Sequence, residues 1–91
     1  MSKEYNERKL EVLIYARDYE PITSQNVADD LDIEIHNARM LLLKYHRQGL
    51  LSRRSEFERK IYNISDKGLS RIEYLIINPP FQLKISERME G

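Results

Sequence analysis

The sequence lacks cysteine, any long apolar run and any excess of charge of one sign, and the first two absences each remove a class of protein. Without cysteine, the 91-residue chain has no disulfide, no thiol chemistry and no thiolate metal site. No apolar run approaches the roughly 18 residues that a membrane span needs, and residues 1–8 lack the hydrophobic stretch of a signal peptide. We therefore expect a cytoplasmic protein that has no membrane partner.

The balance of charge excludes less than it first suggests. The chain carries 15 Lys plus Arg against 15 Asp plus Glu, and such neutrality by itself argues against a nucleic-acid binder. The charges are segregated, however: residues 1–35 hold 4 basic and 9 acidic side chains, residues 36–60 hold 7 and 2, and residues 61–91 hold 4 and 4. A basic block of this kind can place a positive field on one face of a neutral molecule.

Signatures of catalysis and of metal binding are also missing. The sequence has no Gly-rich phosphate loop, no nucleophile motif and no histidine paired with a carboxylate at an active-site spacing. His36 and His46 fall on different sides of one predicted helix, and no ligand set converges on them. We expect no enzyme, no metal and no cofactor.

Hydrophobic spacing predicts one domain over residues 1–78, which begins with three helices. The first helix should run to about Tyr19 and end because Pro21 cannot donate a helical hydrogen bond. Thr23 should cap a short second helix, and a third should run from about Glu34 to Gln48 and end at Gly49.

A β-hairpin and a fourth helix are predicted next. Strands are expected over residues 50–55 and 60–64, with the charged stretch 56–59 as a loop between them. Ser65 should cap the last helix, which should bury one apolar side formed by Leu69, Ile72, Leu75 and Ile76. Residues 79–91 form a tail suited to a dimerisation arm. The fold class is α+β and mostly helical.

Three segments carry a resemblance to a known family. Residues 22–31 look like the opening of a winged helix-turn-helix, residues 45–51 like the end of its recognition helix, and residues 62–69 like its second wing strand running into the next helix. Over about residues 22–72 the chain resembles MarR-like small archaeal and bacterial transcriptional regulators. Asn26 stands where that family often has a capping-box glutamate, so the second helix is expected to begin loosely.

The resemblance implies a three-helix core, a two-stranded wing and a C-terminal helix, with the third helix in the major groove of DNA and the wing on the flanking backbone or minor groove. On the side of the third helix away from its apolar stripe, the candidates for base readout are His36, Asn37, Arg39 and Met40. The candidates for phosphate contact are Ser24, Gln25, Lys44, Arg47, Arg53, Arg54, Arg59 and Lys60.

Other interpretations stay open for the same residues. The basic residues are also compatible with a solvated helix face and with strand edges that discourage pairing. Met40 and Leu43 together are typical of a protein-binding patch, and Glu34 places negative charge beside the reading face, where it either favours the helix dipole or reads a cytosine amino group. The alternative function is therefore a winged-helix protein–protein interaction module of a larger assembly.

The predicted function is that of a sequence-specific, double-stranded DNA-binding transcriptional regulator, associated with the nucleoid. Two half-sites one helical turn apart require a two-fold dimer, so we expect a homodimer. Its interface is predicted to include Tyr74, Ile77, Phe81, Leu83 and Ile85.

Overall fold

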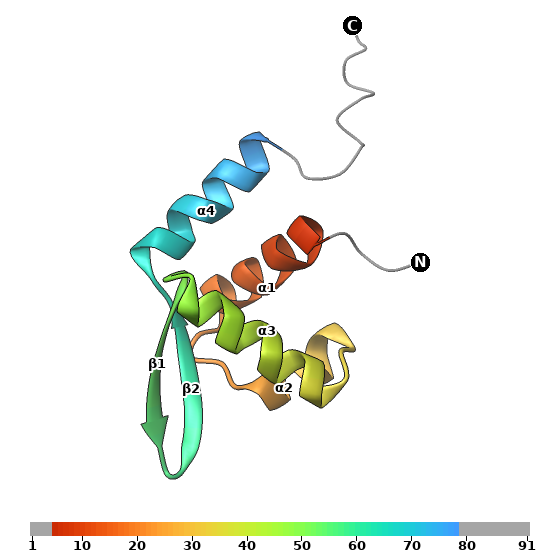
Figure 1. The fold of residues 1–91 in the computed structure, drawn as a ribbon, viewed down its shortest axis with the longest axis vertical. Coiled ribbons are helices and arrows are strands. Elements are labelled where there is room, and N and C mark those ends of the chain that lie inside the picture. Colours follow the sequence, from red (N-terminus) through yellow and green to blue (C-terminus); the bar gives the residue numbers. More distant parts are fainter. Residues whose placement is uncertain (1–4, 79–91) are drawn as a thin grey trace, which may run out of the picture.

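A computed structural model describes residues 5–78, which form four helices and one two-stranded sheet (Figure 1). In chain order the elements are α1 (Tyr5–Tyr19), α2 (Ser24–Leu31), α3 (Ile35–Arg47), β1 (Leu51–Glu56), β2 (Arg59–Ile64) and α4 (Asp66–Ile77). The order of three helices, a hairpin and a fourth helix is the mostly helical α+β arrangement that the sequence predicts.

The segment between α1 and α2 is fixed by local hydrogen bonds. The backbone N–H of Glu20 donates to the carbonyl of Ala16 at 2.9 Å, and Pro21 then ends α1. At the start of α2, Thr23 Oγ1 accepts from the N–H of Asn26 at 3.2 Å, and Asn26 Oδ1 accepts from the N–H of Thr23 at 3.0 Å. The capping box is complete, so the expectation of a loose start is wrong: the shorter asparagine side chain also reaches back to the cap.

Helix α3 is one residue shorter at each end than predicted, because its caps lie just outside the helix. Glu34 caps the start, and its carboxylate accepts from the N–H of Asn37 at 3.1 Å. At the other end Gly49 adopts φ 81°, a left-handed conformation that costs glycine no steric strain. The chain then turns, and the N–H of Leu50 donates to the carbonyl of Tyr45 at 2.9 Å.

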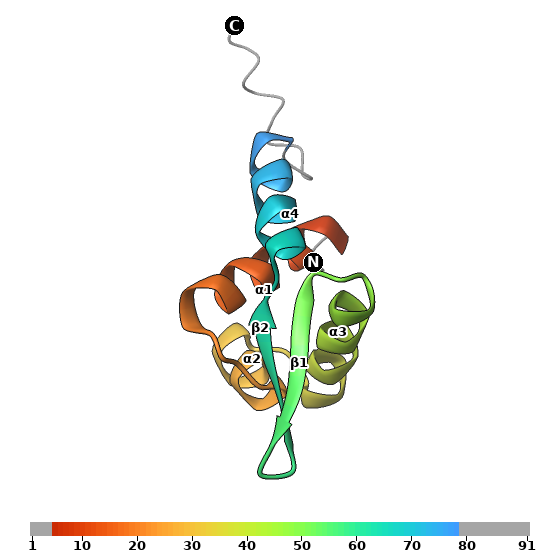
Figure 2. The ribbon, with the colours of Figure 1, turned by 90° about the vertical axis from the view of Figure 1, so that its left-hand side faces the viewer.

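Strands β1 and β2 form an antiparallel hairpin, which we call the wing. The register pairs Leu51 with Ile64 at the base and Glu56 with Arg59 at the tip. The predicted four-residue loop is therefore shorter in the structure, a two-residue turn in which Phe57 and Glu58 have φ values of 49° and 65°. Figure 2 shows the wing projecting beyond α2 and α3.

The base of the wing is joined to the segment that precedes α2. Ile22 and Tyr62 exchange two backbone hydrogen bonds, of 2.9 and 2.8 Å, which form an isolated bridge. Two residues further along the strand, the N–H of Ile64 donates to the Glu20 carboxylate at 2.8 Å. The base of the wing thus moves with the helical body, whereas its tip extends away from it.

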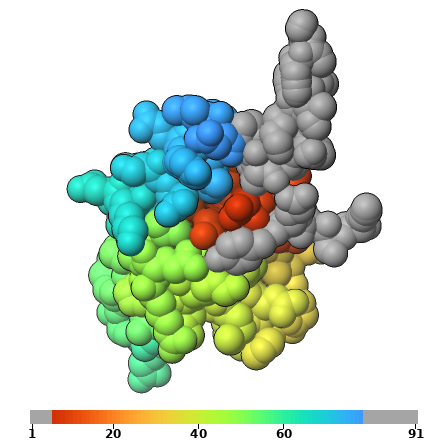
Figure 3. All heavy atoms as spheres, turned by 45° about the horizontal axis from the view of Figure 1, so that its top comes forward, coloured from red at the N-terminus to blue at the C-terminus, as the bar shows by residue number. Residues whose placement is uncertain are grey.

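The core lies between α1, α3 and the base of the wing, where apolar residues of all three meet. Its buried residues include Val12, Leu13, Ala16, Ile22, Val27, Ala38, Leu42, Tyr45, Leu50, Leu51, Tyr62 and Ile72. Helix α4 packs on α1, and Figure 3 shows part of α1 at the surface between α4 and α3. The core therefore holds α3 by one side only and leaves the opposite side of this helix exposed.

Helix α4 buries a different side from the one predicted. Ile72 and Leu75 are buried as expected, but Leu69 and Ile76 are exposed. The third residue on the buried side is Gly68, where an added Cβ would lie 2.2 Å from the carbonyl oxygen of Leu50. The buried side of α4 therefore includes Gly68, where the helix backbone lies close to Leu50. Hydrophobic periodicity does not predict this side, because glycine counts as neither apolar nor polar.

Candidate nucleic-acid interface

The outer side of α3 is an exposed surface of mixed chemistry. His36 and Arg47 are exposed, Met40 is 51% exposed and Leu43 is partly buried, as expected for positions opposite the buried Ala38. Asn37 and Arg39, which flank this side, are exposed as well. All four residues predicted for base readout therefore lie on the accessible part of one helix.

The acidic residue at the start of α3 is engaged by the helix itself. Hydrogen bonds from the backbone N–H of His36 and then of Asn37 hold the pKa of the Glu34 carboxyl below its ordinary value. The carboxylate thus satisfies amides that have no partner within the helix and favours the positive end of the helix dipole.

Two of the acids on α2 are engaged in a similar way. Asp30 accepts a hydrogen bond from the hydroxyl of Tyr15, and Asp29 accepts from the Gln25 amide at 2.9 Å. Burial, together with the bond to Asp30, raises the pKa of Tyr15 to about 12. The Gln25 amide, a predicted phosphate contact, is therefore shared with a neighbouring carboxylate.

A groove of about 470 Å³, here called the wing groove, lies between the start of α2, α3 and the wing. Its lining residues are Thr23, Ser24, Gln25, Ile35, Arg39, Leu43, Arg53, Glu58, Arg59, Lys60 and Tyr62. Six of the predicted contact residues meet here: Ser24, Gln25, Arg39, Arg53, Arg59 and Lys60. Four of them are cations against the single acid Glu58, so the groove has a net positive charge that an anion would meet.

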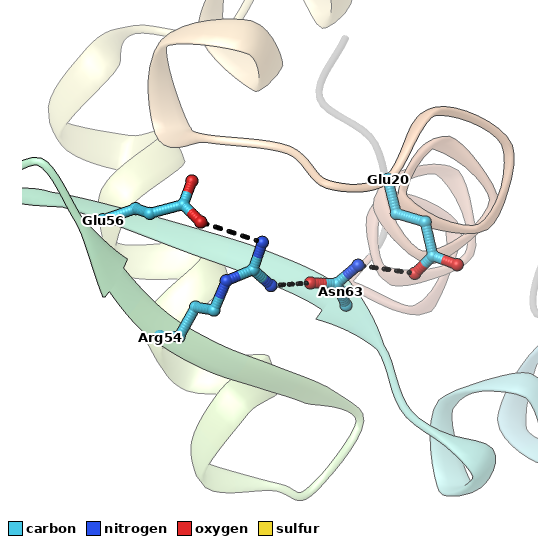
Figure 4. A network of polar contacts seen from close by, with 4 residues as sticks. All are labelled: Glu20, Arg54, Glu56 and Asn63. Carbon is cyan, nitrogen blue, oxygen red and sulfur yellow. Dashed lines mark hydrogen bonds and ion pairs between the residues drawn. The ribbon is translucent and has the colours of Figure 1, made fainter.

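Arg54 lies outside the wing groove, although it was predicted as a phosphate contact with its neighbours. Its guanidinium donates to Asn63 Oδ1 at 2.9 Å and pairs with Glu56 at 3.4 Å (Figure 4). Asn63 in turn donates to the Glu20 carboxylate at 3.3 Å. Because successive side chains of a strand point to opposite faces, Arg54 belongs to the face of the wing away from the groove that Arg53 lines.

Lys44 and Arg47 lie along a second groove, of about 760 Å³, on the other flank of α3. Its lining residues are Arg8, Ile33, Asn37, Met40, Leu41, Leu43, Lys44, Tyr45, Arg47 and Gln48. The predicted cations are thus divided between two sides of α3. Sequence reasoning missed Arg8, an α1 residue that pairs with Glu11 at 2.7 Å, because nothing in its local pattern indicates that it approaches α3.

Part of the predicted dimer surface can be located. Tyr74 and Ile77 are both exposed on α4, and the guanidinium of Arg71 lies 5.4 Å from the centre of the Tyr74 ring. Phe81, Leu83 and Ile85 lie outside the described residues. Within residues 5–78, no helix is long and apolar enough to cross a bilayer, and no group of three or more His, Asp or Glu side chains is arranged to hold a metal ion.

Comparisons with known proteins identify the fold. No protein-family model matches the chain, and no curated protein matches it significantly by sequence. Among solved structures, the chain is similar to MepR of Staphylococcus aureus, described as a transcription regulator of the multidrug efflux pump MepA, with 19% identity, a TM-score of 0.58, and coverage of 91% of this chain and 68% of that one.

Two MepR mutants agree with this result. One, from a multidrug-resistant clinical isolate, aligns with a TM-score of 0.63 at 17% identity and covers 91% of this chain and 70% of its own. Another, bound to an oligodeoxyribonucleotide, aligns with a TM-score of 0.59 at 17% identity, over 91% and 68% of the two chains. The chain therefore has the fold of these MepR structures, a winged helix-turn-helix, as the sequence predicts.

Proposed function

We propose that the protein is a transcriptional regulator that binds double-stranded DNA in a sequence-specific manner, with α3 in the major groove and the wing on the flanking backbone. The observation that carries the proposal is the wing groove, where Arg39 of α3 and three cations of the wing line one surface. Because a recognition helix and a wing contact the same stretch of duplex, cations of both must lie on a common side. A MepR mutant, which has the same fold, has been seen bound to an oligodeoxyribonucleotide.

The roles proposed for the individual residues follow from their chemistry and position. Asn37 pairs with adenine and Arg39 with guanine, while His36 and Met40 complete the base contacts, Met40 against a thymine methyl group. Arg53, Arg59 and Lys60 neutralise phosphates from the wing, and Ser24 and Gln25 hold a phosphate near the start of α2. Lys44 and Arg47 reach the backbone on the far side of α3, and Arg54 has at most a long-range effect because of its internal partners.

Salt dependence tests this proposal directly. We expect the protein to bind mixed duplexes of about 30 base pairs in fluorescence anisotropy at low salt, and to lose affinity steeply between about 50 and 200 mM salt as counterions are released. Arg53→Ala combined with Lys60→Ala should flatten that dependence. Binding that is insensitive to salt, or no binding at low salt, would reject a role in DNA binding.

We further propose that two copies assemble as a homodimer through α4 and the segment that follows it. The exposed Tyr74 and Ile77 support this, since large apolar side chains at the end of a helix are stabilised when a partner covers them. Light scattering at micromolar concentration should give the mass of a dimer, and Ile77→Asp should shift it to that of a monomer. A wild-type monomer would overturn this part of the proposal.

A second function is favoured by one specific observation. Met40 and Leu43 lie with Ile33 and Leu41 in the groove on the far flank of α3, which is an apolar surface a partner protein could cover. The two functions predict different effects of Met40→Ser: it would abolish capture of a protein partner, whereas in a DNA-binding protein it would remove only the thymine contact and leave the slope of log affinity against log salt unchanged. A module that binds protein alone would also be indifferent to loss of Arg53.

A further inference from the structure

The tip of the wing carries an aromatic side chain that the fold does not use. Phe57 is 92% exposed, whereas the next most exposed large apolar side chain of the described residues, Ile77, is 71% exposed. At this exposure the ring packs against nothing in the described part of the chain. Phe57 therefore contributes no burial to the stability of the domain.

The backbone at the tip is also unfavourable for the residues that occupy it. Phe57 and Glu58 both adopt positive φ, 49° and 65°, in a two-residue turn that normally selects Asn and Gly. A bulky residue at such a position strains the chain, and its exposed ring adds a solvation cost. The combination points to a contact made outside the molecule.

The position of Phe57 at the tip of the wing indicates what kind of partner it contacts. Glu58, Arg59 and Lys60, which follow it, line the wing groove, and the base of the wing is held to the body by the Ile22–Tyr62 bridge. A six-residue strand such as β2 spans about 20 Å. That length is close to half a turn of duplex, roughly 17 Å, which separates a major groove from the minor groove beside it.

We propose that Phe57 enters the minor groove next to the site of α3 and wedges its ring against a base-pair step, partly unstacking the step and bending the duplex. This inference rests on the proposed function. Apolar side chains inserted between base pairs kink DNA toward the major groove, and pyrimidine–purine steps yield most easily. Phe57 would thereby select sequence through the deformability of DNA, with no hydrogen bond to a base.

The two acids beside Phe57 are compatible with this placement. Glu56 is paired with Arg54 at 3.4 Å, and Glu58 faces the groove with Arg59 and Lys60. The other charged residues of the hairpin are three cations and one acid: Arg53, Arg59, Lys60 and Glu58. Together they give the tip of the wing a net positive charge, which attracts the phosphates on either side of a minor groove. The ring can thus advance between the two backbones while the cations hold them.

The experiment compares the wild type with Phe57→Gly, Phe57→Ala and Phe57→Leu on a duplex selected by the wild type from a random pool. Glycine removes the ring and also relaxes the turn, so Phe57→Gly should be folded at least as well as the wild type. We expect Phe57→Gly and Phe57→Ala to bind about 5- to 20-fold more weakly, and Phe57→Leu to stay within about threefold, as a shorter wedge. Thermal unfolding of each variant provides the control for folding.

A 2-aminopurine placed at successive positions beside the α3 site reports unstacking directly. Its fluorescence should rise at one step when the wild type binds, and this rise should be lost with Phe57→Gly. If Phe57→Gly binds within twofold and no position responds to the wild type, the wedge is refuted while DNA binding stands. If the wild type binds no duplex at low salt, the proposed function fails and the wedge fails with it.

Discussion

Arg53 and Arg54 are neighbours in the chain but lie on opposite faces of the wing. Arg53 pairs in register with the buried Tyr62 and lines the wing groove, whereas Arg54 donates to Asn63 at 2.9 Å on the other face. Both are arginines of β1, so they have the same charge and the same side-chain length. They therefore form a matched pair for testing whether the wing groove is the DNA surface.

We expect Arg53→Ala to weaken DNA binding by about 3- to 10-fold and to reduce the slope of log affinity against log salt by about 1, because one phosphate contact is lost. Arg54→Ala should stay within about twofold. Anisotropy titrations at several salt concentrations measure both quantities. Equal effects of the two substitutions would mean that total charge, and not the groove, governs binding.

The start of α3 offers a second test, since Glu34 caps this helix next to the reading face. Serine is a good N-cap without charge, so Glu34→Ser should keep the helix and tighten DNA binding by about 2- to 3-fold through reduced repulsion of phosphate. Glu34→Ala should lower the melting temperature. Unchanged DNA affinity for Glu34→Ser would mean that the carboxylate is far from the bound duplex.

The same carboxylate predicts a pH dependence. Its pKa is lower in the folded protein than in the unfolded chain, so its stabilising effect is complete above the unfolded pKa and is lost as pH falls through the folded one. The stability difference between the wild type and Glu34→Ala should therefore shrink in acid. Urea unfolding at a series of acidic pH values measures it, and a constant difference would contradict the cap.

The hydroxyl of the buried Tyr15, which donates to Asp30, predicts that stability falls as pH rises in the basic range. Because folding raises the pKa of Tyr15 from 10.0 to about 12, the folded protein retains a proton that the unfolded chain releases. Its stabilising effect is complete below pH 10 and is lost as pH rises toward 12, by at most about 3 kcal/mol. The difference in free energy of unfolding between the wild type and Tyr15→Phe should therefore become smaller from pH 10 to pH 12. A difference that does not change with pH would show that the Tyr15 hydroxyl does not cause the stabilisation.

Gly68 tests the packing of α4 on the rest of the domain. An added Cβ would lie 2.2 Å from the Leu50 carbonyl oxygen and 2.7 Å from the Ile64 side chain, and the backbone atom cannot move aside cheaply. Gly68→Ala should destabilise the domain by about 1–3 kcal/mol, as overpacking does. Ser70→Ala, an exposed change in the same helix, is the control. Thermal unfolding that ranks the two variants alike would refute the close approach.

The helices are predicted well from the sequence because single residues determine where they begin or end. Thr23, Pro21, Gly49 and Ser65 act locally, so the ends of α1, α2, α3 and α4 follow from hydrogen-bonding rules that need no tertiary information. The exposed side of α3 followed from a 3.6-residue period for the same reason.

The remaining features depend on geometry that the sequence does not display. The sequence presents the wing cations as one group, because it does not fix which face of a strand is turned inward until the register is known. The loop over residues 56–59 is predicted, but its reduction to a two-residue turn at Phe57 and Glu58 is not, since neither residue favours positive φ. The grouping of Arg8 with α3 comes only from the packing of α1.

The pair of hydrogen bonds between Ile22 and Tyr62 has a consequence for the DNA itself. It ties the wing to the segment that leads into α2, and α2 packs on α3, so the wing and α3 keep a fixed angular relation. A duplex that meets both at once must present its successive grooves at one rotational phase. For a protein that binds DNA in the proposed manner, overwinding or underwinding the duplex would bring one groove out of phase, and we expect it to weaken binding.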